Sequence, residues 1–291
     1  MNQPNGKLNT KEIGGTPVKK VDGIWCKCEH LNPTGSVKDR GLAYTISKIK
    51  LKGISKSVIS SSGNAAISAA YFCAPAGISL TVFISPHIHP AKYFALKKYS
   101  CEIRVSMTPV SDCVKFARLT NSYNLRQSTD PWGVLGFSSI SHELVKQVPE
   151  ADALFVPVSS ATTLVGIARG FLKEGLTPCV HAVQTQKVHP IASLFDKDFT
   201  ASGKSIADAI VARVTPRFDE AVKIIRESRG SGWVIVDKVI KAAWNTLKAN
   251  GIYCSYEGAA AFAAVQKARD KKIIIKNPVV IITVKYYAES K

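Results

Sequence analysis

The sequence of 291 residues lacks the features that mark membrane, secreted and repeat proteins. Its richest apolar stretch, Ala65–Leu80, is interrupted by Pro75 and Gly77, so no uninterrupted run is long enough to span a bilayer. Residues 1–15 are polar and contain no apolar signal core. Internal repeats and low-complexity linkers are also missing. These absences predict a soluble, cytoplasmic protein that makes no use of a membrane.

Cysteine pairs of the kind that bind zinc are missing as well. The seven cysteines are scattered and none stands in a CxxC pair. Cys26 and Cys28 would share one face of a strand, but no second pair lies at zinc-site spacing. We therefore expect reduced thiols and no metal site.

Acidic residues are scarce. Asp and Glu number 21 against 39 Lys and Arg, which gives a formal net charge of +18. The basic residues are dispersed and are not interleaved with aromatic residues as a groove for a nucleic-acid strand requires, so no specific nucleic-acid partner is expected. An anionic substrate and a solvated basic surface both stay open as explanations of the charge.

What the sequence does contain is a regular alternation of short β-rich runs with helical patterns. Hydrophobic residues make up 46% of the chain, enough for one large unit or for two lobes that share a cleft. Seven runs read as buried strands: Ser57–Ser60, Leu80–Ile84, Glu102–Val105, Ala153–Pro157, Val180–Gln184, Trp233–Val236 and Val279–Thr283. The alternation predicts an α/β fold with mostly parallel sheets covered by helices on both faces.

In such folds ligands bind where strands end and helices begin. The segment from Asn32 to Gly41 (NPTGSVKDRG) has this character, because Pro33 and Gly35 force a loop and a helix follows from Asp39. Burial and the positive end of a helix both lower the pKa of a lysine, so Lys38 could supply the neutral amine that Schiff-base chemistry needs. An ordinary exposed lysine near a helix start is the alternative.

Two further polar segments stand between a strand and a helix. Ser60–Asn64 offers hydroxyl and N–H groups that could hold a carboxylate or a phosphate, although Ser62 could simply cap the helix. Ser159–Thr163 carries four hydroxyl groups that could hold a phosphate monoester, with helix capping again as the alternative.

Together these segments resemble the fold type II (tryptophan synthase β-like) family of pyridoxal-phosphate (PLP) enzymes, which includes threonine synthase, cysteine synthase and the serine/threonine dehydratases. NPTGSVKDRG is similar to the Schiff-base motif of the family, and SSSGNAAISAA to its Ser-Ser-Gly-Asn-Ala-Ala segment. Thr16-Pro17-Val18 resembles the Thr-Pro-Leu that opens the catalytic core. The resemblance extends from about residue 14 to residue 285.

The resemblance implies pyridoxal 5'-phosphate as the cofactor and a role for each motif. Lys38 would form the Schiff base and act as the catalytic acid and base, and Asn64 would bind the ring hydroxyl of the cofactor. Thr283 would face the pyridine nitrogen. The resemblance assigns two more sets of residues. The substrate carboxylate would be bound by Ser61, Ser62 and Gly63. The cofactor phosphate would be bound by Ser159, Ser160, Ala161, Thr162 and Thr163.

The implied organisation has two domains and two chains. Residues 1–44 and 133–291 would form the larger, cofactor-binding domain, and residues 45–132 the smaller domain that binds the substrate carboxylate. A homodimer is usual in the family.

The sequence departs from the family pattern at three places. The phosphate loop is usually rich in glycine, whereas this one has Ala161 among hydroxyl residues. Glycines often follow the residue at Thr283, where this chain has Val-Lys-Tyr-Tyr, so Lys285 could point into the site. The Glu-Pro of the family corresponds to Ser255-Tyr256, with Glu257 displaced by two. These departures put the substrate in doubt more than the cofactor.

Within the family the motifs look most like threonine synthase, and Ser205–Ile210 resembles the Ser/Thr-x-Ala-x-x-Ile segment of that branch. The expected reaction is γ-elimination of phosphate from O-phosphohomoserine followed by addition of water at the β-carbon, so the expected partner is a phosphorylated amino-acid substrate. A cysteine synthase or a serine/threonine dehydratase is one alternative. A PLP-fold protein without catalytic activity is the other.

Overall fold

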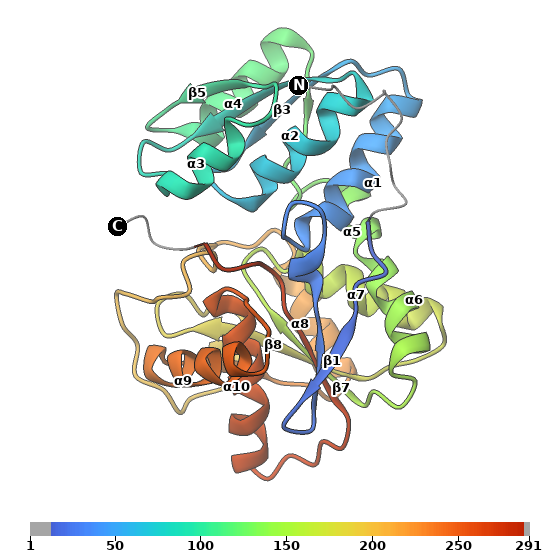
Figure 1. The fold of residues 1–291 in the computed structure, drawn as a ribbon, viewed down its shortest axis with the longest axis vertical. Coiled ribbons are helices and arrows are strands. Elements are labelled where there is room, and N and C mark those ends of the chain that lie inside the picture. Colours follow the sequence, from blue (N-terminus) through green and yellow to red (C-terminus); the bar gives the residue numbers. More distant parts are fainter. Residues whose placement is uncertain (1–12, 288–291) are drawn as a thin grey trace. The chain divides into compact units, whose positions relative to one another are not determined.

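The computed structural model describes residues 13–287, which form two compact units (Figure 1). The smaller unit contains residues 13–14, 32–136 and Tyr287 of the described chain. The larger unit contains residues 15–31 and 137–286. The predicted α/β class, with mostly parallel sheets between helices, is confirmed.

The smaller unit is built on a parallel four-stranded sheet in the order β5-β4-β3-β6. Its strands are β3 (Lys56–Ser60), β4 (Ser79–Ile84), β5 (Glu102–Val105) and β6 (Tyr123–Asn124). Its helices are α1 (Lys38–Leu51), α2 (Asn64–Ala76), α3 (Pro90–Leu96), α4 (Pro109–Thr120) and α5 (Pro131–Gly136).

Alternation along β3 and β4 sends apolar side chains to both faces of this sheet. Val58 and Phe83 pack with Cys113 of α4 on one face. Ile59 and Val82 belong to the cluster on the opposite face, where α1 and α2 pack. Because successive strand residues point to opposite sides, strands with apolar side chains on both sides need helices on both faces.

The larger unit is built on a six-stranded sheet in the order β1-β2-β10-β7-β8-β9. Its strands are β1 (Val18–Val21), β2 (Ile24–Lys27), β7 (Ala153–Pro157), β8 (Cys179–Thr185), β9 (Gly232–Ile235) and β10 (Pro278–Ile281). All neighbours are parallel except β1 and β2, which form an antiparallel hairpin at the edge. Its α-helices are α6 (Ser138–Gln147), α7 (Thr162–Lys173), α8 (Phe218–Glu227), α9 (Asp237–Ala249) and α10 (Tyr256–Asp270). Two 3₁₀ helices, η2 (Glu29–Leu31) and η3 (Ala192–Leu194), complete the unit.

Helix α10 approaches the larger sheet closely because its buried face consists of small residues. Ala259, Ala260 and Ala264 are fully buried there. A Cβ on Gly258 would lie 3.2 Å from Ile282 Cγ2, so even one added methyl group would press on the chain that leaves β10. In Figure 1, α9 and α10 lie on one face of this sheet, with α7 and α8 on the other. The chain segments that follow β7 and β10 are thereby held by packed helices.

All seven predicted strands are present, with boundaries shifted by at most two residues. The β1–β2 hairpin and the short β6 were not predicted. The segment expected to form the smaller domain, residues 45–132, lies inside the smaller unit, which also includes all of α1. The ligand-binding roles assigned to the two domains stay a prediction.

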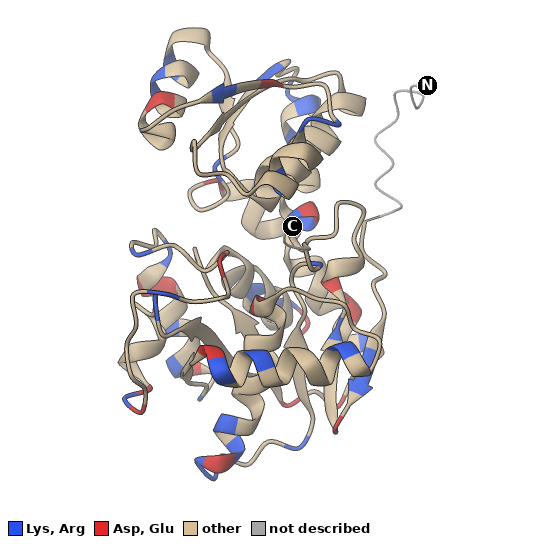
Figure 2. Ribbon diagram, turned by 60° about the vertical axis from the view of Figure 1, so that its left-hand side comes forward, with Lys and Arg blue, Asp and Glu red and all other residues tan. Residues whose placement is uncertain are grey.

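The basic residues are spread over the elements of both units and are not gathered on one of them (Figure 2). This dispersion matches the pattern of the sequence. Among residues 13–287 no helix combines the length and apolar character that crossing a bilayer requires.

Candidate active site

The loop before α1 is fixed by hydrogen bonds within the Asn32–Gly41 motif. Gly35 adopts a φ of 83°, which favours glycine, and its N–H donates to the Asn32 carbonyl at 2.7 Å. Asp39 accepts from the Thr34 N–H at 2.8 Å and from the Thr34 hydroxyl at 2.6 Å. The loop therefore closes on the first turn of α1, and Lys38 is the first residue of that helix.

Lys38 has the altered basicity that its proposed chemistry needs. Its side chain is half-buried, and burial lowers the pKa of Lys38 to about 8. At pH 7 a lysine with this pKa is neutral about one-tenth of the time, whereas an exposed lysine is neutral less than about one-thousandth of the time. Helix α1 is also held from outside, since a Cβ on Gly136 of α5 would clash with the Arg40 carbonyl oxygen. Because only glycine fits there, Gly136 allows α5 to pack directly against the first turn of α1, which begins with Lys38.

The second motif forms the turn between β3 and α2 in the smaller unit. The Ser61 hydroxyl accepts from the Gly63 N–H at 3.2 Å, and the Ser62 hydroxyl accepts from the Ser85 N–H at 2.8 Å. Within residues 13–287 neither hydroxyl proton has an acceptor in the structure. The N–H groups of Asn64 and Ala65, in the first turn of α2, likewise have none in that range. The turn can thus donate several hydrogen bonds to a carboxylate.

Asn64 begins α2 and is 8% exposed. Its Oδ1 atom accepts a hydrogen bond from the Tyr287 hydroxyl at 3.0 Å. Its Nδ2 group has no acceptor among residues 13–287. Asn64 is nine-tenths buried as a residue while its Nδ2 donor is unused, so a ligand can accept a hydrogen bond from it. Tyr287 was not singled out in the sequence, because its contact spans 223 positions.

The third motif forms the turn between β7 and α7 in the larger unit. Ala161 is the N-cap of α7 and takes a φ of 61°, in the left-handed region that favours glycine. Ala161 therefore adopts a conformation that favours glycine, in a loop where the family pattern usually has glycines. The N–H groups of Ser160, Ala161 and Thr163 have no acceptor in the described part of the chain. The turn is a cradle of backbone donors at a helix N-terminus, suited to a phosphate.

The hydroxyl groups of this turn are partly committed to other contacts. The Ser159 hydroxyl accepts from the N–H groups of Val211 and Ala212, each at 3.2 Å. Ser160 and Thr162 share a hydrogen bond at 3.1 Å between their hydroxyl oxygens. Ser159 thus fastens the segment after Ser205–Ile210 to the turn, a role that its place in the sequence did not suggest.

Glu257 fastens the same region from α10. Its carboxylate is 5% exposed and accepts from the Ala209 N–H at 2.8 Å. Asp237 of α9 accepts from the Ser205 hydroxyl at 2.8 Å and from the Ile206 N–H at 3.1 Å. The acidic residue that the sequence showed as displaced from the family pattern therefore has a structural partner in this chain.

Thr283 follows β10 and is 6% exposed, with no hydrogen-bond partner for its hydroxyl within residues 13–287. Lys285 is exposed, and its backbone pairs with Cys254 in an isolated bridge. The chain after Thr283 is thereby tied to the segment before α10, since Ser255 N–H also donates to the Val284 carbonyl at 2.8 Å. Thr283 keeps an unused hydroxyl on the ordered end of a central strand.

The nominated residues fall into two sets according to unit. Lys38, Ser61, Ser62, Gly63 and Asn64 belong to the smaller unit, where α1 packs against α2. The Ser159–Thr163 turn and Thr283 belong to the larger unit, where they follow the neighbouring strands β7 and β10. The first set contains an amine, an amide and a turn with hydrogen-bond donors. The second contains a turn suited to a phosphate and a neutral hydroxyl.

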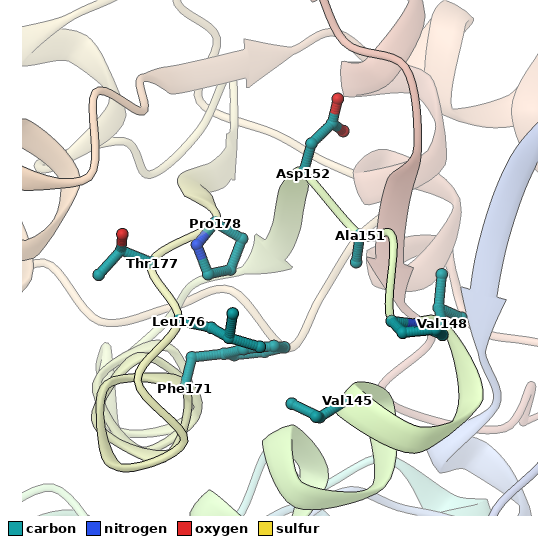
Figure 3. Close-up of a pocket in the computed structure, with 9 residues that line it drawn as sticks. Val145, Val148, Ala151, Asp152, Phe171, Leu176, Thr177 and Pro178 are labelled. Carbon is teal, nitrogen blue, oxygen red and sulfur yellow. The ribbon is translucent and has the colours of Figure 1, made fainter.

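A surface pocket of about 270 Å³ lies elsewhere in the larger unit (Figure 3). It is lined mainly by apolar side chains, among them Val145, Phe171 and Leu176. The carboxylate of Asp152 points away from this lining and accepts from the N–H groups of Lys276 and Asn277. None of the nominated residues lines the pocket, whose polar lining residues are Asp152 and Thr177.

Metal-ligating side chains do not gather in the described chain. Residues 13–287 contain no group of three or more His, Cys, Asp or Glu side chains placed to hold an ion. Burial raises the pKa of the Cys28 thiol to about 11 and that of Cys254 to about 12, so these thiols stay protonated.

The fold and these turns define an α/β protein with a half-buried lysine of lowered pKa and with helix N-termini that can bind anions. Comparison with known proteins agrees: the model of the pyridoxal-phosphate dependent enzyme family matches residues 10–284. The chain therefore belongs to the pyridoxal-phosphate dependent enzyme family. The resemblance to fold type II, the assignment as an enzyme and the cofactor, pyridoxal 5'-phosphate, are confirmed.

Curated relatives are named threonine synthase. The one from Methanosarcina acetivorans is 27% identical over 94% of this chain and 74% of its own length. The one from Synechocystis is 28% identical over 90% of this chain and 72% of its own length. Among solved structures, maize serine racemase superposes with a TM-score of 0.82 at 20% identity, covering 94% of this chain and 88% of that one. At this identity the solved structure supports the fold alone.

The residues of each unit fit the cofactor. The smaller unit has a lysine with lowered pKa and an amide donor, Nδ2 of the largely buried Asn64, without an acceptor in the described chain. The larger unit has the turn at Ala161, whose backbone N–H groups can receive a phosphate, and the unused hydroxyl of Thr283. The role that the resemblance implies for Thr283, a neutral hydroxyl facing the pyridine nitrogen, stays a prediction.

Proposed function

We propose that this enzyme is a threonine synthase-like lyase that converts O-phosphohomoserine and water to threonine and phosphate. The observation that carries the proposal is the Asn32–Gly41 junction, which places Lys38 on the first turn of α1 with its pKa lowered to about 8. Similarity to threonine synthases along 90–94% of the chain supports the choice of substrate.

The reaction requires protons to leave two carbons in succession. When bound, the cofactor withdraws electrons from the substrate and makes the hydrogens on its Cα and Cβ acidic. The Lys38 amine is the base that removes them, first from Cα and then from Cβ, and the phosphate leaves from Cγ. One proton is returned to Cγ after the phosphate has left, water adds its oxygen at Cβ, and a second proton is returned to Cα. Both protons that Lys38 takes thus go back to carbon, and the proton released by the water leaves with the phosphate. A base with a pKa near 8 can both take and return protons at physiological pH.

The two turns hold the two charged ends of the reactants. The Ser61–Ser62–Gly63 turn and the first N–H groups of α2 bind the substrate carboxylate. The Ser159–Thr163 turn binds the cofactor phosphate, and Thr283 faces the pyridine nitrogen. In this arrangement the smaller unit carries Lys38 and the turn for the substrate carboxylate, and the larger unit carries the turn for the cofactor phosphate. We also propose that the enzyme is a cytoplasmic homodimer.

A parallel substrate screen tests the reaction. Purified holoenzyme is incubated with O-phosphohomoserine, and phosphate, threonine and 2-oxobutyrate are measured together. We expect phosphate and threonine in equal amounts and no accumulation of 2-oxobutyrate. Cysteine formed from O-acetylserine or O-phosphoserine and sulfide, without turnover of O-phosphohomoserine, would favour a cysteine synthase. A 2-oxo acid as the main product would favour a dehydratase. Inertness towards every substrate with cofactor bound would favour a non-catalytic protein.

The site of cofactor attachment is tested separately. Borohydride reduces a lysine Schiff base to a stable amine, so peptide mapping of the reduced holoenzyme reads out which lysine is involved. We expect the label on Lys38. A label on another lysine would refute the assignment of the catalytic base whatever the substrate is.

A further inference from the structure

A tyrosine outside the family motifs contacts the candidate cofactor ligand Asn64. The Tyr287 hydroxyl donates to Asn64 Oδ1 at 3.0 Å, and both residues belong to the smaller unit. The Tyr287 ring packs against the apolar core of that unit, and Lys92 Nζ lies 5.8 Å from the centre of the ring. The ring is thus anchored independently of its hydroxyl.

The environment of Tyr287 keeps the phenol protonated. Burial, together with the charge of Asp39, raises the pKa of Tyr287 to about 12. The hydroxyl therefore remains a donor through the pH range in which such an enzyme works. In the structure the hydroxyl donates, so Oδ1 is the Asn64 atom that faces the tyrosine. The flipped amide would donate from its NH₂ group to the phenol oxygen and turn Oδ1, an acceptor, towards the ligand.

Fixing one end of the amide determines what the other end presents. With Oδ1 held by Tyr287, the Nδ2 group is the part of Asn64 left to bind a ligand, and it has no acceptor among residues 13–287. The ring oxygen of the cofactor, which the proposed function places against Asn64, is negatively charged when the Schiff base carries the imine proton. It needs a donor and would be repelled by Oδ1.

We propose that Tyr287 is a positioning residue that holds the Asn64 amide with Nδ2 towards the cofactor's ring oxygen. The proposal rests on the function proposed above, because it takes Asn64 as the ligand of that oxygen. It assigns a role to one of the two tyrosines that replace glycine-type residues after Thr283. The departure from the family pattern at this place then supports the cofactor site.

The test compares Tyr287→Phe with Tyr286→Phe in the full chain. Phenylalanine keeps the anchored ring at 287 and removes only the hydroxyl. We expect the dissociation constant of the cofactor to rise roughly three- to tenfold, the usual effect of losing one hydrogen bond. We also expect the ratio of the two Schiff-base absorption bands to shift towards the species protonated on the ring oxygen.

Tyr286 provides the matched control. It packs against Trp244 and Tyr256 in the larger unit, and the structure gives its hydroxyl no partner among residues 13–287. Tyr286→Phe should match the wild type in both measurements.

A double-mutant cycle shows whether Tyr287 acts through Asn64. If it does, Tyr287→Phe has little further effect on cofactor affinity or on the absorption ratio in an Asn64→Ala background. An equal effect in both backgrounds, or a Tyr287→Phe variant indistinguishable from the wild type, would overturn the inference. Borohydride labelling separates the two levels of the argument. If Lys38 is labelled but the double-mutant cycle shows no coupling between Tyr287 and Asn64, only the role of Tyr287 is refuted. If Lys38 of the wild type is not labelled, both the proposed function and this inference are refuted. Thermal unfolding of the apoproteins checks that all variants fold.

Discussion

The turn before α2 and the turn before α7 present two solutions to one problem. Each follows a buried parallel strand and opens a helix, and each leaves N–H groups without an acceptor in the described chain. The turn before α2 has an extended N-cap, Gly63, with φ of −140°. The turn before α7 has Ala161 at φ of 61°. The turn before α2 therefore has an unstrained backbone, whereas the turn before α7 holds one alanine in the left-handed conformation.

The difference extends to the side chains. Before α2, the protons of Ser61 and Ser62 and the amide of Asn64 are available to a ligand. Before α7, Ser160 and Thr162 share a hydrogen bond and the Ser159 oxygen accepts from the 211–212 segment, so the donors on offer are the Ser159 proton and, mainly, the backbone N–H groups of Ser160, Ala161 and Thr163. Side-chain donors can be exchanged to change specificity, while a backbone cradle binds the same group whatever the substrate. This division suits a variable substrate carboxylate on one side and an invariant cofactor phosphate on the other.

The largest effect is expected from Lys38→Ala, which removes the covalent chemistry of the smaller unit and leaves phosphate binding in the larger unit intact. Lys38→Ala should lower turnover of the preferred substrate by at least about a thousandfold, because it removes both the point of attachment and the catalytic base. Cofactor should still bind without a covalent bond, which equilibrium dialysis measures. Turnover within tenfold of the wild type would show that another group is the base.

The pH dependence of cofactor attachment is the next effect in size. Only the neutral amine attacks an aldehyde, and the pKa of Lys38 is lowered to about 8. The attachment rate of apoprotein with PLP should therefore level off above about pH 8. It should fall towards tenfold for each pH unit below that value, as the amine becomes protonated. Stopped-flow absorbance measures the rate. The control is lysine amide acetylated on its α-amino group, whose side-chain amine has an ordinary pKa near 10.5. Its rate of reaction with PLP should continue to increase above pH 8.

Reciprocal serine substitutions test the division between substrate and cofactor. Ser61→Ala with Ser62→Ala should raise KM for the amino acid by roughly tenfold or more, since hydrogen bonds to charged groups contribute about 1.5–3 kcal/mol each. Cofactor affinity should change little. Ser159→Ala with Thr162→Ala should have the opposite pattern, with a loss of cofactor affinity of about tenfold and a nearly constant KM.

The second pair needs a control for folding, because the Ser159 hydroxyl also holds the segment at Val211. Thermal unfolding of each apoprotein shows whether a loss of affinity reflects the site or the fold. If both pairs changed KM and cofactor affinity equally, the assignment of one turn to each ligand would be wrong.

Local chemistry made most of this structure predictable. Buried strands such as Ala153–Pro157 were recognised because runs of apolar β-formers between helical patterns have few other meanings. The β1–β2 hairpin was missed, because Val18–Val21 contains two lysines and is exposed at three of four positions to some degree. Lys38 at the start of α1 followed from Pro33 and Gly35. The pairing of Tyr287 with Asn64, and of Ser159 with Val211, depends on long-range folding that no local pattern encodes.

The smallest effect tests the backbone difference between the turns directly. A left-handed φ costs a residue with a Cβ about 1–2 kcal/mol, while glycine loses roughly 0.5–1 kcal/mol more in conformational entropy on folding. Ala161→Gly should therefore leave stability unchanged or raise it by up to about 1.5 kcal/mol, and cofactor affinity should not fall. At the other turn, an added Cβ on Gly63 meets no atom within 4 Å and its φ is extended, so Gly63→Ala should gain about 0.4–1 kcal/mol from the unfolded state. Urea denaturation of the apoproteins measures both changes. A clear destabilisation by Ala161→Gly would mean that the alanine methyl group packs well enough to outweigh its strain. The two turns would then differ in side-chain packing rather than in backbone freedom.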